Sequence, residues 1–306
     1  GAVMECTKLL YEYLGDLIVL DVGGATTDLH SVTVESDQVA RLMISPEPKA
    51  KRTVEGDLGV YVNRWKVVES IGEEKLREQC REQGFSMEHA LETYRAIPKT
   101  EEEVKLVELL TREAVVKAAE RHAGRLRYIY GPSGRSTVAE GKDLTQVKYI
   151  VGTGGALTRL PHREEIMREI TRCNESGMLL LPGEHAQILV DHDYIMASLG
   201  VLSKRYPQAA ARLLEQSLGI TFPERKAEEP VPVCNKELSR LETQRQQREE
   251  ELRRHIEECE AMGYDMSAYR ENKPKAGDCS HECSRCTRLH CPNRITQSAN
   301  KKSIGN

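Results

Sequence analysis

The sequence predicts an α/β fold, a mixed sheet with flanking helices, for residues 1–222 of this 306-residue chain. Three observations carry this prediction. Short apolar runs alternate with amphipathic helical segments, the apolar run 17–20 leads into a glycine-rich turn, and a second run at 147–151 ends in glycines as well. Strands that alternate with helices are typical of sheets that carry helices on their faces.

Strands are expected where short apolar or β-branched runs are bounded by turn residues. The turn 35–38 is expected to join the second and third strands into a hairpin, and 131–135 is expected to be a plain turn between strands rather than a phosphate contact through Ser133 and Arg135. The expected strands are 17–20, 29–34, 39–44, 126–130, 147–151 and 188–190.

Helices are expected where apolar residues recur at helical spacing. The clearest begins after Thr100, which can cap it, and continues with glutamates that favour the positive end of the helix dipole. It should end near His122, before Gly124. The other expected helices are 57–70, one or two within 74–96, one at 161–173 and two within 194–218.

The composition changes after residue 222. Residues 223–235 contain three prolines and several charges and are expected to be a linker. Residues 236–262 are rich in Glu, Arg and Gln with a thin apolar stripe, which predicts a charged, solvated helix. Residues 263–306 form a cysteine-rich tail with few other apolar residues.

The overall composition narrows the class of protein. Hydrophobic residues make up 39% of the chain and charged residues 30%, as in globular proteins. A formal net charge of −4 gives no general reason to bind nucleic acid. No apolar stretch approaches the ~18 residues of a membrane span, and no signal peptide pattern is seen. We expect no membrane partner and a cytoplasmic location.

The first motif that points to chemistry is Asp21-Val22-Gly23-Gly24-Ala25-Thr26-Thr27-Asp28, which lies between two predicted strands. Glycines allow backbone N–H groups to approach phosphate oxygens closely, and the two threonines can add hydroxyl donors. The two carboxylates suit a hydrated magnesium ion. The alternative is a glycine-rich hairpin whose aspartates only cap it.

The second motif is Tyr149-Ile150-Val151-Gly152-Thr153-Gly154-Gly155-Ala156, followed by a helix. Its glycines can let the chain pass close to a purine or ribose, and the helix start can face a phosphate. Taken alone, this is equally well a generic turn from strand to helix.

These motifs resemble the second phosphate motif and the adenosine motif of the superfamily of actin, hexokinase and the heat-shock chaperone ATPases. Four longer segments, LDVGGATTDLHSV, KRTVEGDLGV, GKDLTQVKYIVGTGGALTRLP and DYIMASLGVLS, resemble the MutL/GlmL glutamate mutase-associated family. The resemblance covers roughly residues 1–220. It implies one ribonuclease H-like lobe, the unit that actin-like ATPases use twice.

The resemblance also implies a function and roles for residues. The family is regarded as ATP-dependent reactivating factors for adenosylcobalamin-dependent mutases, including glutamate mutase and amino-acid aminomutases. ATP with magnesium is the implied cofactor, and a mutase subunit the implied partner. Asp21 and Asp28 would act at the metal and the attacking water. The phosphates would be bound by Gly23, Gly24, Thr26 and Thr27, and adenosine by Gly152, Gly154 and Gly155.

Two further expectations follow from the resemblance. Actin-like ATPases carry an earlier phosphate motif on a second lobe, and these residues hold none, so we expect a fragment that does not hydrolyse ATP well by itself. Asp57, in Glu55-Gly56-Asp57, would help to close the nucleotide cleft, or would simply cap the helix that follows it.

Four of the nine cysteines cluster in the tail, with the spacing C-x3-C-x2-C-x4-C. Clustered thiols without a secretion signal favour a metal site over disulfides. A zinc ion, an iron–sulfur cluster and an unmetallated tail all remain open. The candidate metal ligands are Cys279, Cys283, Cys286 and Cys291.

Two alternatives to a reactivating factor remain. An ATP-dependent iron–sulfur electron-transfer activator of a dehydratase would combine actin-like lobes with the cysteines. A non-catalytic binding module would use the lobe as a scaffold and the tail to recruit a partner.

Overall fold

The computed structural model describes residues 1–132 and 134–223, together with Gln247, Glu250, Arg253, Arg254, Glu257 and Ala261. The chain divides into two units, residues 1–225 and 226–306. In the second unit the six described residues are helical and exposed. The predicted linker, charged helix and cysteine-rich tail otherwise lie outside the described residues, so they stay predictions.

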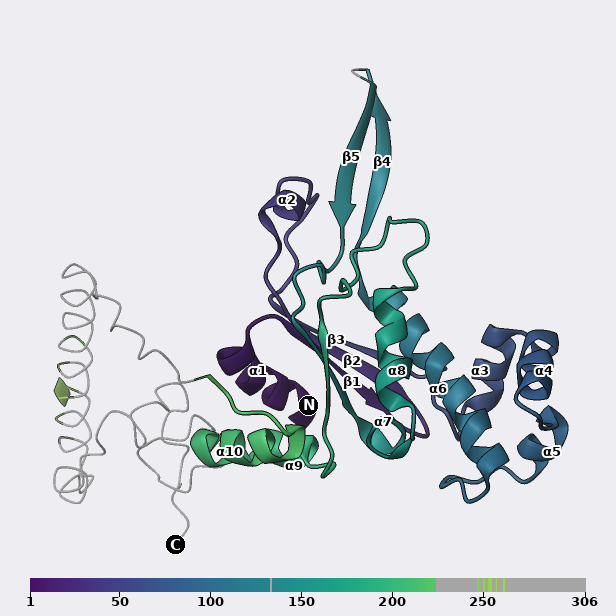
Figure 1. Ribbon diagram of the computed structural model, residues 1–306. Helices are drawn as coiled ribbons and strands as arrows, with labels where there is room; N and C mark the ends of the chain where they lie inside the picture. The colour runs from purple at the N-terminus through teal and green to yellow at the C-terminus, as the bar shows by residue number, and fades with distance from the viewer. Residues whose placement is uncertain are drawn as a thin grey trace, which may run out of the picture. The chain divides into compact units, whose positions relative to one another are not determined.

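A five-stranded mixed sheet is the centre of the first unit, which confirms the predicted fold class (Figure 1). Its order is β3-β2-β1-β6-β7. The first three strands are antiparallel, and β6 and β7 lie parallel to β1. The strands are β1 (Leu17–Val22), β2 (Thr27–Val32), β3 (Ala50–Glu55), β6 (Tyr149–Thr153) and β7 (Gln187–Val190).

The parallel pairing of β1 with β6 brings the two glycine motifs together. Leu20 lies beside Gly152 and Asp21 beside Thr153, so both strands end at the same edge of the sheet. Both strands are almost wholly buried, because helices cover the two faces.

Helix α6 (Glu101–His122) packs on one face with α7 (Gly154–Arg159) and α8 (Arg163–Arg168), which leads into the short 3-10 turn Glu169–Thr171. Its start is as predicted: Thr100 Oγ1 accepts from the N–H of Glu103, whose side chain accepts from the N–H of Thr100. Three shorter helices pack against the same core, α3 (Arg64–Ile71), α4 (Glu73–Glu82) and α5 (Met87–Glu92).

The opposite face is covered by α1 (Ala2–Leu14), α9 (Met196–Leu202) and α10 (Pro207–Leu218). Helix α1 was not anticipated from the sequence, although it buries Val3, Leu10 and Leu14 at helical spacing. It approaches α9 closely, since a Cβ on Gly200 would lie 1.8 Å from the carbonyl oxygen of Ala2.

Strands β4 (Arg125–Gly131) and β5 (Gly134–Glu140) form a separate antiparallel ribbon (Figure 1). The prediction of a strand at 126–130 followed by a hairpin turn is confirmed. This strand does not join the main sheet but projects away from it.

Three sequence predictions about these elements are wrong, the first being the hairpin turn at 35–38, where α2 begins instead. Residues 39–44 are not the third strand: α2 (Asp37–Ala40) occupies part of this segment, capped by Ser36, and the third strand is β3. Half-exposed β3 has few apolar residues, so its pattern is weak. The helix expected from residue 57 begins only at Arg64, because the backbone of 60–62 bonds to the β1–β2 turn.

Candidate functional site

The site is built on the tight turn that joins β1 to β2. The N–H of Gly23 donates to the carbonyl oxygen of Thr26 at 2.9 Å, which closes the turn, and Gly24 and Ala25 are exposed at its tip. The N–H groups of Gly24, Ala25 and Thr26 donate to no acceptor in the described part of the chain. Three successive backbone donors are therefore free to bind an anion.

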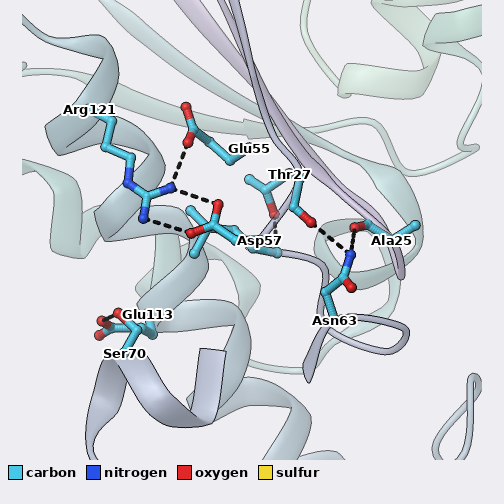
Figure 2. A network of polar contacts seen from close by, with 10 residues as sticks. Ala25, Thr27, Glu55, Asp57, Asn63, Ser70, Glu113 and Arg121 are labelled. Carbon is cyan, nitrogen blue, oxygen red and sulfur yellow. Dashed lines mark hydrogen bonds and ion pairs between the residues drawn. The ribbon is translucent and has the colours of Figure 1, made fainter. Parts of the chain in front are cut away.

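The segment 58–63 holds this turn from one side. The carbonyl of Gly23 accepts from Val60 N at 3.2 Å, and that of Gly24 accepts from Tyr61 N and Val62 N at 2.9 and 2.7 Å. Asn63 Nδ2 donates to Ala25 O at 2.8 Å (Figure 2). Because the carbonyl oxygens of the turn accept hydrogen bonds from this segment, only the backbone N–H groups of the turn remain available to a ligand.

The contact between the turn and this segment is unusually close. A Cβ on Gly59 would lie 2.2 Å from the carbonyl carbon of Ala25, so no larger residue fits. Thr27 adds a buried bond, since its hydroxyl donates to Leu58 O at 2.7 Å. The hydroxyl of Thr27 is thus used to hold the turn, whereas that of Thr26 makes no hydrogen bond within residues 1–132 and 134–223.

The two aspartates of the motif face each other across β1 and β2. Asp28 Oδ2 accepts from Arg52 Nη2 at 2.6 Å and from Arg52 Nε at 3.2 Å. Its Oδ1 is buried and has no partner among the described residues. Burial, and then the nearby Asp28 carboxylate, raise the pKa of Asp21. A cation at this pair would relieve both the repulsion and the unpaired oxygen.

Gly154 brings the second motif against Asp21. It has a φ of +85°, and a Cβ there would lie 2.6 Å from Asp21 Oδ1 and 2.5 Å from the carbonyl oxygen of Val22. Only glycine combines this backbone conformation with this closeness. The structure therefore places the turn after β6 directly beside the carboxylate at the end of β1.

The other two glycines of the second motif differ from Gly154. Gly152 is buried, and a Cβ there would lie 2.6 Å from Met167 Sδ, so this glycine makes room for helix packing. Gly155 is exposed with open space beside it. Gly155, unlike Gly152, is accessible to a ligand.

Asp191 was not singled out from the sequence, yet it fixes this edge of the sheet. It is fully buried and accepts from Thr153 Oγ1 at 2.8 Å and from Ser217 Oγ at 2.6 Å. It also accepts from the N–H groups of Ile195 and Met196. A lone aspartate after a short strand gave no signal, because its partners come from distant segments.

Asp57 forms a bidentate ion pair with Arg121, with both distances 2.8 Å (Figure 2). Arg121 also donates to Glu55 Oε2 at 2.7 Å, and hydrogen bonding by Arg121 lowers the pKa of Asp57. The interpretation of Asp57 as a helix cap is wrong, since α3 begins at Arg64. Asp57 instead ties the end of β3 to α6.

Comparison with known proteins decides the family. The family model described as MutL protein matches residues 1–218. The chain belongs to the MutL family. It is 34% identical over 230 residues to a protein named Protein MutL from Clostridium tetanomorphum, an alignment covering 71% of this chain and 50% of that relative. The chain thus spans about half the length of the curated relative that it matches.

Two buried histidines of this MutL-family chain lie near the site. The ring nitrogens of His122 lie 2.8 Å from Ser31 Oγ and 2.9 Å from Thr53 Oγ1. His30 is 1% exposed, and neither ring nitrogen has a partner in the described residues. Burial lowers the pKa of His30 to about 4 and that of His122 to about 3.

The predicted tail metal site of this MutL-family chain lies outside the described residues. Within the residues that are described, no group of three or more His, Cys, Asp or Glu side chains could hold a metal ion. The described cysteines, Cys6, Cys80 and Cys173, are free thiols whose pKa values are raised by burial. Nor does any described helix have the length and apolarity to cross a membrane.

Proposed function

We propose that this chain is one nucleotide-binding lobe of an ATP-dependent reactivating factor for an adenosylcobalamin-dependent amino-acid mutase, of the glutamate mutase or aminomutase type, acting in the cytoplasm. Membership of the MutL family supports this. So does the sheet order β3-β2-β1-β6-β7, with three antiparallel strands followed by two parallel ones, which is the order of a ribonuclease H-like lobe of an actin-like ATPase.

The observation that carries the proposal is the β1–β2 turn itself. Its carbonyls are engaged by residues 60–63, while the N–H groups of Gly24, Ala25 and Thr26 are free at an exposed tip. Such a row of donors suits the β- and γ-phosphates of a nucleotide. Gly23 and Thr27 shape this row, the former by closing the turn and the latter through its bond to Leu58.

The donor set also fits magnesium. The unpartnered Oδ1 of Asp28 and the carboxylate of Asp21 are the hard oxygen ligands that a hydrated magnesium ion prefers. The ion would neutralise phosphate charge. Asp21 would orient the attacking water, and the absence of a side chain at Gly154 leaves room for the Asp21 carboxylate. Gly154 and the exposed Gly155 would adjoin the adenosine, with Gly152 behind them.

Hydrolysis needs more than this lobe. Phosphoryl transfer depends on positioning and charge stabilisation from all sides of the phosphate, and the first phosphate motif of actin-like ATPases is not among these 306 residues. We therefore expect the 306-residue chain to bind nucleotide weakly and to hydrolyse it poorly. In the whole reactivating factor, the mutase would have to bind differently in the two nucleotide states.

Nucleotide binding can be tested by titrating the isotopically labelled 306-residue chain with Mg–ATP in NMR. We expect the amide signals of Gly24, Ala25 and Thr26 to shift most. Gly24→Val should abolish the shifts, because a Cβ at Gly24 already lies 3.2 Å from Tyr61 Cβ. Gly56→Val is the matched control, since nothing lies within 4 Å of a Cβ there. Unchanged binding by Gly24→Val would exclude the turn.

Reactivation needs a separate assay. A mutase inactivated by damaged cobalamin should regain activity with ATP, fresh adenosylcobalamin and a MutL-family protein that contains this lobe. Asp21→Asn should remove the effect. Recovery that does not need ATP would contradict an ATP-driven mechanism.

A non-catalytic binding module is the second candidate. It is favoured by the engagement of Thr27 with Leu58 and of Asp28 with Arg52, which a purely structural hairpin would also show. An absence of amide shifts in the Mg–ATP titration would support it. The iron–sulfur activator depends on tail cysteines outside the described residues, and visible absorbance of anaerobic preparations tests it.

A further inference from the structure

The β4–β5 ribbon presents large apolar side chains to solvent. It projects from the body of the first unit (Figure 1), and Tyr128, Ile129 and Tyr130 are 48%, 50% and 79% exposed. Successive side chains on a strand point to opposite faces, so Tyr128 and Tyr130 share one face of the ribbon near its tip and Ile129 lies on the other. Contiguous exposed apolar residues mark interaction sites.

The ribbon is held firmly only at its base. Leu126 N donates to Met178 O at 2.7 Å on one edge, and Ala139 N donates to Leu42 O at 2.7 Å on the other. Beyond these bonds, the described residues between Leu126 and Ala139 pair only within the ribbon. An isolated two-stranded ribbon is marginally stable in water, so a partner at the tip would stabilise it.

The ribbon is basic. It carries Arg125, Arg127 and Arg135, whereas its one carboxylate, Glu140, is paired with Arg127 at 2.7 Å. The guanidinium of Arg135 lies 4.5 Å from the centre of the Tyr128 ring, beside Tyr130 in the paired register. The tip therefore combines tyrosines with uncompensated positive charge, and its partner should be apolar and acidic.

A surface with those properties exists on helices α3 to α5 of the same chain. A groove of about 630 Å³ has Trp65, Val68, Met87 and Leu91 as its apolar lining, and Trp65 is 55% exposed. Its volume lies within the range of ligand pockets. The remaining lining residues are all acidic: Glu69, Glu73, Glu88 and Glu92.

The rim of this groove keeps an acidic excess. Arg77 pairs with Glu73 and Glu88, at 2.9 and 2.7 Å, and Lys66 pairs with Glu69 at 3.0 Å. The Arg64 guanidinium also lies 5.3 Å from the centre of the Trp65 ring, so three cations stand against four carboxylates here. Glu92 forms no ion pair in the described part of the chain. The groove complements the ribbon in both apolarity and charge.

We propose that the tip of the β4–β5 ribbon of one copy docks into the α3–α5 groove of a second copy, with Tyr130 against Trp65 and Arg135 facing Glu92. The ribbon is anchored at its base on a different part of the unit, so one copy does not fill its own groove. Such a contact joins two different surfaces and is head-to-tail. Repeated, it builds rings or open chains.

Sedimentation velocity of the 306-residue chain over a concentration series tests this. We expect the average mass to rise with concentration. Tyr130→Ser and Trp65→Ser should each raise the dissociation constant at least ~10-fold, as loss of a central aromatic anchor does. Val201→Ser is the matched control, because Val201 is 65% exposed on α9, away from both surfaces. A thermal melt of each variant would check that it is folded.

Two further mixtures make the test specific. An equal mixture of Tyr130→Ser and Trp65→Ser chains retains one intact ribbon and one intact groove, so it should form 1:1 pairs and nothing larger. Chains with Arg135→Glu or Glu92→Arg should each associate more weakly than the wild type, and an equal mixture of these two variants should associate again. A wild-type chain that is monomeric at every concentration would overturn the proposal, as would association that neither aromatic variant weakens. A mixture of Tyr130→Ser and Trp65→Ser chains that stays monomeric would overturn it as well.

Discussion

Replacing Gly154 by alanine should destabilise the fold at the point where the two motifs meet. At a φ of +85° the added Cβ would lie 2.5 Å from Val22 O and 2.6 Å from Asp21 Oδ1. A left-handed backbone costs a residue with a Cβ about 1–2 kcal/mol, and overpacking adds about 1–3 kcal/mol. We therefore expect the free energy of unfolding to fall by roughly 2–5 kcal/mol.

The adjacent Gly155 provides the control. Nothing lies within 4 Å of a Cβ at Gly155, and it lies in the first turn of α7. Gly155→Ala should therefore be neutral or stabilising, by up to about 1 kcal/mol, because alanine favours the helix and restricts the unfolded chain.

Guanidinium denaturation of the two variants gives the comparison, with stability taken from the midpoint at an unchanged slope. The Gly154 variant should also bind Mg–ATP more weakly, since the Asp21 carboxylate must move. The reasoning is refuted if Gly154→Ala unfolds within about 0.5 kcal/mol of the wild type, or if Gly155→Ala destabilises as much.

Three other outcomes can be measured. Burial lowers the pKa of His30 to about 4, so its contribution to the free energy of unfolding is complete above about pH 6.5 and is lost as the pH falls toward 4, at up to ~1.4 kcal/mol per pH unit. Denaturation at about pH 7 and about pH 5 should therefore show a smaller loss of stability for His30→Gln than for the wild type. An equal loss would contradict this. Thr27→Val leaves the buried Leu58 carbonyl without its donor and should lower the free energy of unfolding by about 1–2 kcal/mol. The control Thr93→Val removes an exposed hydrogen bond and should change the free energy of unfolding by less than about 0.5 kcal/mol. Equal effects of the two substitutions would count against the role of Thr27. Metal analysis of protein purified without a His tag should find zinc, whose binding can fold a segment with few apolar residues. The zinc should be lost when Cys279, Cys283, Cys286 and Cys291 are changed to Ser. A wild-type protein free of metal would mean that the tail is unmetallated.

Local sequence signals were sufficient for several elements. The apolar run 17–20 and the glycines after it predicted β1 and its turn, and Thr100 with Glu103 predicted the start of α6. These features depend on residues a few positions apart, so the sequence contains all that is needed. The family resemblance depended on the same compact motifs and is confirmed.

Other elements were missed because their partners are distant in the chain. Strand β3 is a strand because it pairs with β2, although half-exposed residues give it a weak pattern. Residues 60–62 have a helical pattern, yet their N–H groups bond to the turn at Gly23 and Gly24. Backbone hydrogen bonds of this kind override local propensity, and no short window of sequence contains them.

The candidate site shows the same division. The sequence by itself determined that a glycine-rich turn with two aspartates follows a buried strand. Only the tertiary structure decided that Gly154 contacts Asp21, that Gly152 makes room for Met167, and that Thr27 bonds to Leu58. The physical reason is that a glycine pattern is the same whether the missing side chain makes room for a ligand or for the protein itself, and packing between distant segments makes that choice.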